Sequence, residues 1–514
     1  MYHPNHFAQV DPDKPAIIMA SSGQVVTYQQ LDQRSNQIAH LLRKLGLKAG
    51  DHIALQVENR AEFFEIIWAA QRSGLVFTAV STYLTAEETA YIADNSDSKV
   101  FITTKKLIHI ADKVRREHAT QVQHFLSLDS CDEGGDEGFT DLSALLKDYP
   151  VTPIDNEEPG MMMLYSSGTT GRPKGVLPKQ TATTIEELHP SWLALSQVYG
   201  FNQETVYLSP APLYHAAPLA WNMLVMRTGG TTVIMERFDA EDSLAVIERY
   251  QVTHSQWVPI MFVRMLKLEA EVRSRYDLST MRMAIHASAP CPVETKQKMI
   301  DWWGPVINEY YAATEGAGIT LIDSAQWLEH RGSVGLPINS KVHITNDEGT
   351  ELAQGETGTI YFESLVEGDF HYYKDKEKTA EAHHRQGWKT TGDLGYVDEE
   401  GYLYLTDRKA FMIISGGVNI YPQEVESALI QHDDVVDVAV FGIPNEEFGE
   451  EVKAVIQHRQ GLPTDTGEEA SKLLNYCREK ISHIKCPRSI DFIEELPRLD
   501  NGKLYKKKIQ QAYL

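Results

Sequence analysis

One segment in the first half of the chain combines the residue types that bind phosphate groups: YSSGTTGRPKGV, residues 165–176. Its glycines let backbone N–H groups approach a ligand, its hydroxyl side chains donate further hydrogen bonds, and Lys174 adds a positive charge. The apolar residues before it (MMMLY) predict a strand, and α/β folds bind ligands where strands end. It is not a Walker A loop, because Gly175 follows Lys174 where that loop has Ser or Thr. We expect a polyphosphate to bind at Ser166, Ser167, Gly168, Thr169, Thr170 and Lys174.

The segment resembles the phosphate loop of the adenylate-forming superfamily, which includes acyl-CoA synthetases, luciferases and peptide-synthetase adenylation domains. Further segments similar to that superfamily follow in order along nearly the whole chain: PLYHAAP (212–218), HASAPCP (286–292), NEYYAATEG (308–316), KTTGDLGY (389–396), SGGVNIYP (415–422) and PRLDNGK (497–503). This ordered recurrence is far more specific than any single motif. The resemblance, closest to the acyl-CoA synthetase branch, implies ATP, Mg²⁺, coenzyme A and a small carboxylic acid as ligands.

The resemblance also implies a role for each residue of a nucleotide site. Tyr311 stacks on adenine, Thr314 touches the α-phosphate, and Glu315 holds Mg²⁺. An oxygen ligand such as a carboxylate is what this hard cation prefers. Asp393 accepts the ribose hydroxyls. The other nucleotide-binding residues implied are Ser288, Ala289, Pro290, Glu309, Tyr310 and Arg408, and Thr170 is implied as a second metal ligand.

The C-terminal part of the chain is similar to the superfamily's mobile domain. By this resemblance Lys503 is catalytic, opposing the charge that gathers on the α-phosphate, and acts with Thr314, Glu315 and His215. The SGG segment (Ser415, Gly416 and Gly417) borders the path of coenzyme A. The resemblance implies an N-terminal domain, 1–406, and a C-terminal domain, 407–514, that rotates about a hinge at 407–410.

The chain departs from the superfamily pattern in three places. Ala312 stands where the family usually has glycine, and Ala287 and Ser288 stand where relatives commonly have two glycines. The hinge has Ala410 where a charged residue is usual, which puts the pivot in doubt but not the fold.

The acid substrate is expected to be apolar. Peptide-synthetase domains usually bind the amino acid's ammonium with an aspartate in the segment that here reads PLYHAAP, and burying that cation without a partner is costly. An α-amino acid is therefore disfavoured, and a fatty, aryl or steroid side-chain acid is favoured. The residues expected in the acyl pocket are His215, Trp221, Trp257, Met261 and His286.

Two other functions stay open at this point. One is an acyl-adenylate ligase that loads a carrier protein instead of coenzyme A, and the other is a non-catalytic nucleotide-binding protein. A kinase-type or ATP-hydrolysing enzyme is disfavoured, since neither a Walker loop nor a kinase motif set occurs. The nucleophile-elbow pattern GxSxG of thioesterases and lipases is absent as well.

Composition points to an ordinary globular protein. Its 514 residues include 48 Lys and Arg against 72 Asp and Glu, a formal charge of −24, which argues against nucleic acid as a partner. Four cysteines without a CxxC pair are typical of reduced thiols in a cytoplasmic protein. No apolar run is long enough for a transmembrane helix, the N-terminus does not resemble a signal peptide, and a homodimer remains open.

The predicted elements that position these residues make an α/β fold. Strand and helix patterns alternate over residues 1–150, as in parallel sheets flanked by helices; one predicted helix begins after Thr27 as N-cap. After Val334, KVHITN, GTIYFES and GYLYLTD predict a small antiparallel, barrel-like β unit. Helices at 422–431 and 471–481 around the strand VVDVAVFGIP predict a small α+β C-terminal domain.

Overall fold

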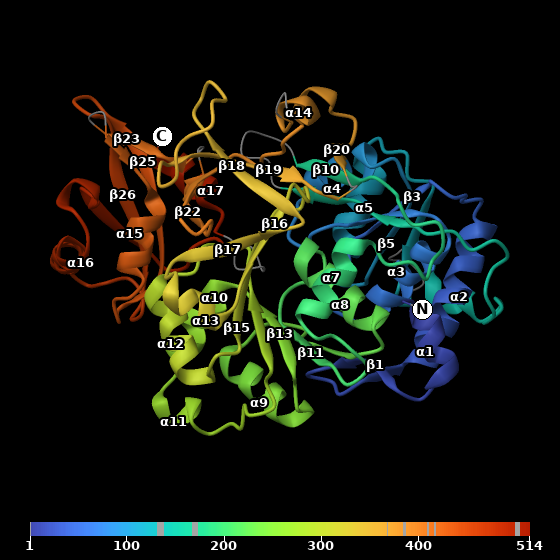
Figure 1. Cartoon of the computed structure of the whole chain (residues 1–514). Coiled ribbons are helices and arrows are strands. Elements are labelled where there is room, and N and C mark those ends of the chain that lie inside the picture. The colour runs from blue at the N-terminus through green and yellow to red at the C-terminus, as the bar shows by residue number, and fades with distance from the viewer. Residues whose placement is uncertain are drawn as a thin grey trace.

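Strands and helices alternate through the first part of the chain in the computed structural model (Figure 1). The structure describes residues 2–130, 138–166, 173–366, 369–383, 387–408, 411–415, 418–498 and 504–513, with only the backbone at 407, 408 and 507. The first helices are α1 (Pro4–Val10), α2 (Tyr28–Lys44), α3 (Glu62–Arg72), α4 (Ala86–Asn95), α5 (Ile108–Glu117) and α6 (Leu142–Leu146). Thr27 and Gln30 form a capping box at the start of α2, so the predicted N-cap is confirmed.

Two large sheets contain most of the strands described up to residue 408. The first is a six-stranded parallel sheet of β7 (Thr140–Asp141), β6 (His124–Ser127), β5 (Ser98–Thr103), β3 (His52–Leu55), β4 (Val76–Ala79) and β8 (Met161–Met162). The second has thirteen strands. Its parallel half contains β1 (Pro15–Met19), β12 (Thr231–Ile234), β11 (Val206–Ser209), β13 (His254–Trp257), β14 (Met283–His286) and β15 (Ile307–Ala312), with β2 (Val25–Thr27) at the edge.

The three antiparallel strands predicted after Val334 are present as β18 (Ser340–Thr345), β19 (Gly358–Ser364) and β22 (Leu403–Arg408), and they continue this second sheet. Three strands that were not predicted complete this half: β16 (Ile319–Ile322), β17 (Ser333–Ile338) and β21 (Asp393–Val397). The change from parallel to antiparallel pairing falls between β15 and β16. The two halves therefore share a backbone ladder, which fixes the ends of β15 and β21 relative to each other.

The strand predicted from MMMLY is wrong as a single element. Met161–Met162 forms β8 and pairs with β4, whereas Leu164–Ser166 forms β9 and pairs with β10 (Lys174–Pro178). Buried Met163 lies between them, and its N–H donates to the carbonyl of Phe77 at 3.0 Å. The chain thus leaves the first sheet at Met163 and enters a three-stranded sheet, β20-β10-β9, in which β20 is Phe370–Tyr372. The phosphate-loop segment connects two antiparallel strands of this small sheet.

The C-terminal residues build a third unit, orange to red in Figure 1. Its sheet contains β24 (Val418–Ile420), β23 (Ile413–Ser415), β26 (Gly449–His458), β25 (Val435–Asn445) and β27 (Ser489–Ile493). Its helices are α15 (Pro422–Leu429), α16 (Thr466–Lys480), α17 (Lys506–Gln510) and the 3₁₀ turns His483–Lys485 and Gln511–Tyr513. The unit lies against α10 (Pro259–Leu266) and α12 (Val293–Trp303), where Gln431 Nε2 donates to Thr295 Oγ1 at 3.1 Å.

Five of the remaining helices lie around the large sheet (Figure 1). They are α7 (Pro190–Val198), α8 (Ala216–Arg227), α9 (Ala240–Tyr250), α11 (Ala270–Arg273) and α13 (Ser324–Glu329). Helix α14 (Lys376–Glu381) lies instead beside β20 of the three-stranded sheet (Figure 1). Within the described ranges, no helix has both the length and the apolar character needed to cross a bilayer.

Candidate functional site

The Asp393 carboxylate is held in one orientation at the first residue of β21. Its Oδ2 accepts a hydrogen bond from the Tyr311 hydroxyl at 2.6 Å and another from Thr391 Oγ1 at 2.8 Å. Tyr311 belongs to β15, so the continuous sheet brings two of the sequence-predicted site residues together. Asp393 retains only 9% exposure. A fixed carboxylate of this kind is suited to accept hydrogen bonds from the vicinal hydroxyls of a ribose.

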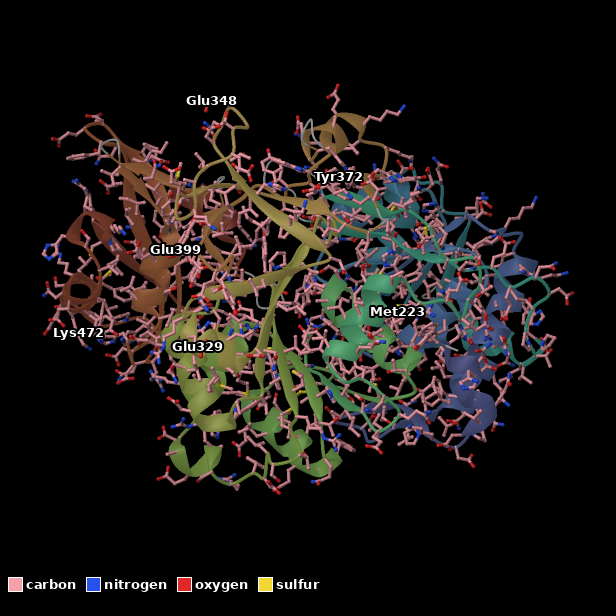
Figure 2. The ribbon with its side chains drawn as sticks, viewed as in Figure 1. Met223, Glu329, Glu348, Tyr372, Glu399 and Lys472 are labelled. Carbon is pink, nitrogen blue, oxygen red and sulfur yellow. The ribbon has the colours of Figure 1, made fainter. Side chains whose placement is uncertain are left out.

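Tyr372, which the sequence analysis did not select, lies between two predicted site residues. Its hydroxyl donates to Glu315 Oε1 at 3.0 Å, and its ring centroid is 4.9 Å from Lys174 Nζ. Figure 2 labels Tyr372 in the region where β20 and β10 run side by side, and the two strands pair at Val176 and Tyr372. Burial raises the pKa of this hydroxyl, and the charge of Glu315 raises it further, so it remains a donor. In the sequence, nothing distinguishes it from the adjacent Tyr373.

Glu315 and Thr314 offer oxygen ligands beside this tyrosine. Glu315 is half-buried and Thr314 is exposed, both in the loop that follows β15. Among the described residues no cationic side chain forms an ion pair with Glu315. A carboxylate and a hydroxyl without a competing cation fit a hard divalent ion such as Mg²⁺.

Several sequence-predicted residues lie outside the described residues. They are Ser167, Gly168, Thr169, Thr170, Gly416, Gly417, Lys503 and the hinge residues 409–410, and Arg408 is described by its backbone alone. The two ends of the phosphate loop are described: Ser166 and Lys174 lie opposite each other in the β9–β10 ladder. Ser415 ends β23.

A buried polar cluster lies behind the nucleotide segments. Lys296 Nζ contacts Glu309 Oε2 at 2.6 Å, and His286 Nε2 is 3.5 Å from the same oxygen. Burial raises the pKa of Glu309, opposed by the charge of Lys296. Burial, and then Lys296, hold the pKa of His286 well below its usual range, so the imidazole is neutral. Glu309 and His286 thus interact with the core and not with an open site.

The side chains of Tyr310 and Trp221 also form hydrogen bonds within the core. The Tyr310 hydroxyl accepts from Trp221 Nε1 and from Gln256 Nε2, each at 3.1 Å. Burial raises the pKa of Tyr310 to about 12. Because side chains alternate along a strand, Tyr310 faces α8 while Glu309 and Tyr311 lie on the other face of β15.

The residues predicted for the acyl pocket differ in their exposure. Trp257 and Met261 are 1% and 2% exposed, and the Trp257 ring packs edge-on against Trp303 with centroids 5.6 Å apart. His215 is half-buried at the N-cap of α8, its ring 4.4 Å from that of Tyr214. Of the five predicted residues, only His215 retains substantial exposed surface; Trp221 and His286 are as deeply buried as Trp257 and Met261.

Ser288 has a backbone conformation that favours glycine. Its φ is +76°, and its side chain is exposed together with that of Ala289. For a residue with a Cβ this left-handed region costs roughly 1–2 kcal/mol. The departure from the glycine pattern at this position is therefore accommodated with backbone strain, and Pro290 follows two residues later.

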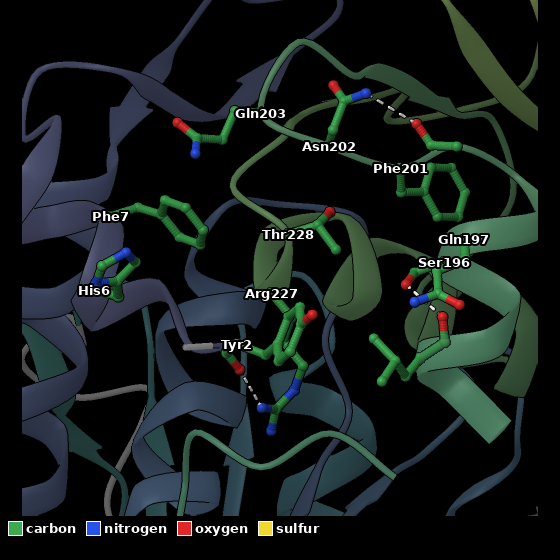
Figure 3. Close-up of a pocket in the computed structure, with 12 residues that line it drawn as sticks. Tyr2, His6, Phe7, Ser196, Gln197, Phe201, Asn202, Gln203, Arg227 and Thr228 are labelled. Carbon is green, nitrogen blue, oxygen red and sulfur yellow. Dashed lines mark hydrogen bonds between the residues drawn. The ribbon is translucent and has the colours of Figure 1, made fainter. Parts of the chain in front are cut away.

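Two cavities lie away from these residues. One, of about 460 Å³, is formed between α1, the end of α7 and the C-terminal end of α8, where Arg227 Nη1 donates to the carbonyl of Tyr2 (Figure 3). The other, of about 640 Å³, lies between α10–α12 and residues 430–433 of the C-terminal unit. Neither contains the motif residues that the structure describes.

In the C-terminal unit, a lysine already pairs with a cluster of side chains that could otherwise bind a metal ion. Asp434, His458 and Glu469 lie together, but Lys472 Nζ is 2.6 Å from Asp434 Oδ2 and 3.2 Å from Glu469 Oε1. Figure 2 labels Lys472 at the edge of the molecule. The ammonium satisfies both carboxylates, so the cluster does not require a metal.

Two family models match most of the chain. The one described as AMP-binding enzyme matches residues 5–365, and the one described as AMP-binding enzyme C-terminal domain matches residues 424–503. Both matches lie in the units that carry the nucleotide and C-terminal motifs.

Relatives of known activity and solved structures resemble the chain over its full extent. It is 30% identical over 512 residues to long-chain-fatty-acid–CoA ligase FadD13 of Mycobacterium tuberculosis, covering 98% of this chain and 97% of that protein. It is 30% identical over 513 residues to feruloyl-CoA synthase of Amycolatopsis sp., with coverages of 98% and 97%. The structure of o-succinylbenzoate CoA synthetase from Bacillus subtilis with its acyl-adenylate intermediate superimposes with a TM-score of 0.81, at 26% identity, covering 99% and 97% of the two chains.

Proposed function

The chain belongs to the family of AMP-binding enzymes, and we propose that the residues described above form the site in which it activates an apolar carboxylic acid. As an AMP-forming acid–thiol ligase it uses ATP to make an acyl-adenylate and pyrophosphate, then transfers the acyl group to coenzyme A and releases AMP. The assignments of individual residues below, and the nature of the acid, are the proposed part.

The observation that carries the assignment is the fixed carboxylate of Asp393. The Tyr311 and Thr391 hydroxyls both donate to its Oδ2. We assign Asp393 to the ribose hydroxyls and Tyr311, from the adjoining strand, to the adenine. Ser288, Ala289 and Pro290 would border the base, with Arg408 near the ribose or phosphate. Glu309 and Tyr310 would support this surface from behind, as their buried contacts suggest.

The phosphates would extend from there toward Lys174 and Glu315. Ser166, Ser167, Gly168, Thr169, Thr170 and Lys174 would hold the β- and γ-phosphates. Glu315 would hold Mg²⁺ with Thr170, and Thr314 would contact the α-phosphate. When bound, the ion neutralises charge on the phosphate oxygens.

In the first half-reaction an oxygen of the acid forms a bond to the α-phosphorus, and the bond to the pyrophosphate oxygen breaks. Negative charge increases on the α-phosphate during this step. Lys503 and Thr314 would oppose that charge, and fixed positioning of the two reactants supplies much of the remaining acceleration.

In the second half-reaction the thiol sulfur of coenzyme A forms a bond to the acyl carbon and its proton passes to water, while the bond from that carbon to the phosphate oxygen breaks and AMP leaves. We propose that the C-terminal domain, 407–514, rotates about 407–410 relative to 1–406 between the two steps. This rotation would withdraw Lys503 and bring Ser415, Gly416 and Gly417 to the path of coenzyme A. The contact of Gln431 with Thr295 would then break.

The acid is proposed to be a fatty or aryl acid. No carboxylate occurs in residues 212–218, where an α-ammonium would need one. His215, at the start of α8, would line the pocket, with Trp221, Trp257, Met261 and His286 packed behind its wall. Met223 on the same helix adds a flexible apolar side chain (Figure 2). The names of the two relatives, a long-chain-fatty-acid–CoA ligase and a feruloyl-CoA synthase, support this range.

The test compares two lysines near the C-terminus. We expect wild type to release pyrophosphate from MgATP with acids of this range and to form acyl-CoA, detected by mass spectrometry. Lys503→Ala should lower kcat/KM for pyrophosphate release at least about 100-fold, as loss of a charge-stabilising group does. Exposed Lys508→Ala should leave it within about twofold.

Three outcomes would contradict this assignment. Equal rates for the two variants would remove Lys503 from the catalytic site. Pyrophosphate release without acyl-CoA would indicate a carrier protein as acceptor. A wild type that binds ATP but releases no pyrophosphate with any acid of the panel would indicate a nucleotide-binding protein.

A further inference from the structure

Tyr372 separates two opposite charges that come from distant parts of the chain. Lys174 follows the phosphate loop on β10, and Glu315 follows β15. The ammonium lies over the face of the Tyr372 ring, and the carboxylate accepts the hydrogen of its hydroxyl. Within the part of the chain that the structure describes, the two charges do not form an ion pair with each other.

The two contacts use different parts of the same side chain. A cation over an aromatic face is attracted by the π electrons and keeps its N–H donors for other acceptors. A neutral hydroxyl that donates a hydrogen bond to Glu315 Oε1 orients the carboxylate without neutralising it. Both charged groups are therefore held in place without pairing with each other.

A direct ion pair between Lys174 and Glu315 would have the opposite effect. It would neutralise both groups and place the ammonium where a divalent cation should bind. The arrangement around Tyr372 keeps the two charged groups apart before ATP and Mg²⁺ bind. Fewer groups then have to rearrange, which lowers the free-energy cost of binding.

We propose that Tyr372 is a positioning residue that holds Lys174 and Glu315 apart and ready, and thereby sets the affinity for ATP in the presence of Mg²⁺. The inference rests on the proposed function, since it takes Lys174 and Glu315 as the groups that face the phosphates and the ion. It predicts that the hydroxyl acts through Glu315 and the ring through Lys174.

The neighbouring tyrosine provides a matched control. The Tyr373 hydroxyl also donates to a carboxylate, Asp97 Oδ2, at 2.8 Å, and Lys374 Nζ pairs with the other oxygen of Asp97. That group of residues is not part of the proposed site. Tyr373→Phe therefore removes the same atom from the same strand end without touching Glu315.

The experiment measures ATP binding by calorimetry on the full chain, with and without Mg²⁺, and needs no turnover. Tyr372→Phe should weaken binding about tenfold with Mg²⁺ and change it less than twofold without Mg²⁺, as loss of one hydrogen bond to a charged group does. Tyr372→Leu should weaken binding in both conditions, because Lys174 also loses the ring. Tyr373→Phe should match wild type.

A double-mutant cycle tests the route through Glu315. Glu315→Gln should abolish most of the Mg²⁺ dependence, and Tyr372→Phe added to it should have no further effect on binding. Additive effects, or equal effects of Tyr372→Phe and Tyr373→Phe, would overturn the inference while leaving the proposed function intact. A wild type that does not bind ATP would overturn both. If Tyr372→Phe does not fold, the Mg²⁺ dependence of ATP binding is compared between Glu315→Gln and Tyr372→Leu. Loss of this dependence in both variants supports the inference, and its loss in Glu315→Gln alone overturns it.

Discussion

Two polar regions meet at strand β15, and they differ in what their charges face. In the inner region, which is buried, Lys296 Nζ and His286 Nε2 lie 2.6 and 3.5 Å from Glu309 Oε2. In the outer region, Asp393 and Glu315 accept hydrogen bonds from the hydroxyls of Tyr311 and Tyr372. In the first region the charges neutralise each other, whereas in the second neutral hydroxyls orient them and leave their charge available. This contrast leads us to propose that the inner region contributes to stability and the outer region to binding.

The largest expected effect comes from breaking the inner pair. Lys296→Met leaves Glu309 buried without a cation, and loss of one partner of a buried pair costs about 3–5 kcal/mol of unfolding free energy. Urea denaturation should show this loss, and the double variant Lys296→Met/Glu309→Gln should recover much of it. A loss below about 1 kcal/mol in the single variant would contradict the description of this region as structural.

Removing the negative charge of Asp393 should weaken ATP binding and leave the stability of the fold unchanged. Asp393→Asn keeps the shape of the side chain but weakens a charged acceptor, so the Kd for ATP should rise about tenfold or more. Asp97→Asn is the control, since Asp97 also accepts a tyrosine hydroxyl, from Tyr373. Calorimetry measures both variants. Equal ATP affinity in the two variants would remove Asp393 from the nucleotide site.

The inner region should also make stability depend on pH. The pKa of His286 is held well below 6.5 by burial, so the unfolded chain binds a proton at this residue that the folded chain does not. Stability is therefore fully present above about pH 6.5 and is lost as the pH falls below it, by up to about 1.4 kcal/mol per pH unit for one histidine.

Denaturation at pH 7, 6 and 5 checks this dependence. His286→Leu should reduce the slope of unfolding free energy against pH by about one proton. His254, whose pKa burial lowers to about 4, remains in this variant and keeps part of the slope. An unchanged slope would show that the imidazole of His286 is protonated in the folded chain.

The smallest effect is expected at Ser288, whose backbone is strained. Ser288→Gly relieves a φ of +76°, worth roughly 1–2 kcal/mol, but adds about 0.5–1 kcal/mol of chain entropy to the unfolded state. We expect a net stabilisation of about 0.5 kcal/mol by urea denaturation. Destabilisation by more than about 1 kcal/mol would contradict the strain.

The sequence predicts a feature well when the contacts that form it join residues close together along the chain, and poorly when they join distant residues. The start of α2 was predictable because Thr27 and Gln30 are three residues apart. The division of MMMLY into β8 and β9 was not, because it depends on a hydrogen bond from Met163 to the distant Phe77. The nucleotide motifs point to Tyr311 and Asp393, but the contact between these two side chains depends on the sheet that contains both β15 and β21.

The residues that sequence reasoning missed act through partners far along the chain. Tyr372 is 57 positions from Glu315, and its neighbour Tyr373 has the same residue type but contacts Asp97. Lys296 gives no local signal of burial, since a lysine on a helix is usually exposed. Conversely, Trp221 and His286 have residue types suited to a pocket, but the fold uses them in its core.

The account depends on transfer of the acid's oxygen to phosphorus. The most direct measurement uses a fatty or aryl acid with ¹⁸O in both carboxylate oxygens, incubated with the wild-type chain, MgATP and coenzyme A. Mass spectrometry of the nucleotide product should find AMP with one ¹⁸O, because the thiol attacks carbon and the labelled oxygen stays on phosphorus. Unlabelled AMP, or ADP as the product, would contradict formation of an acyl-adenylate.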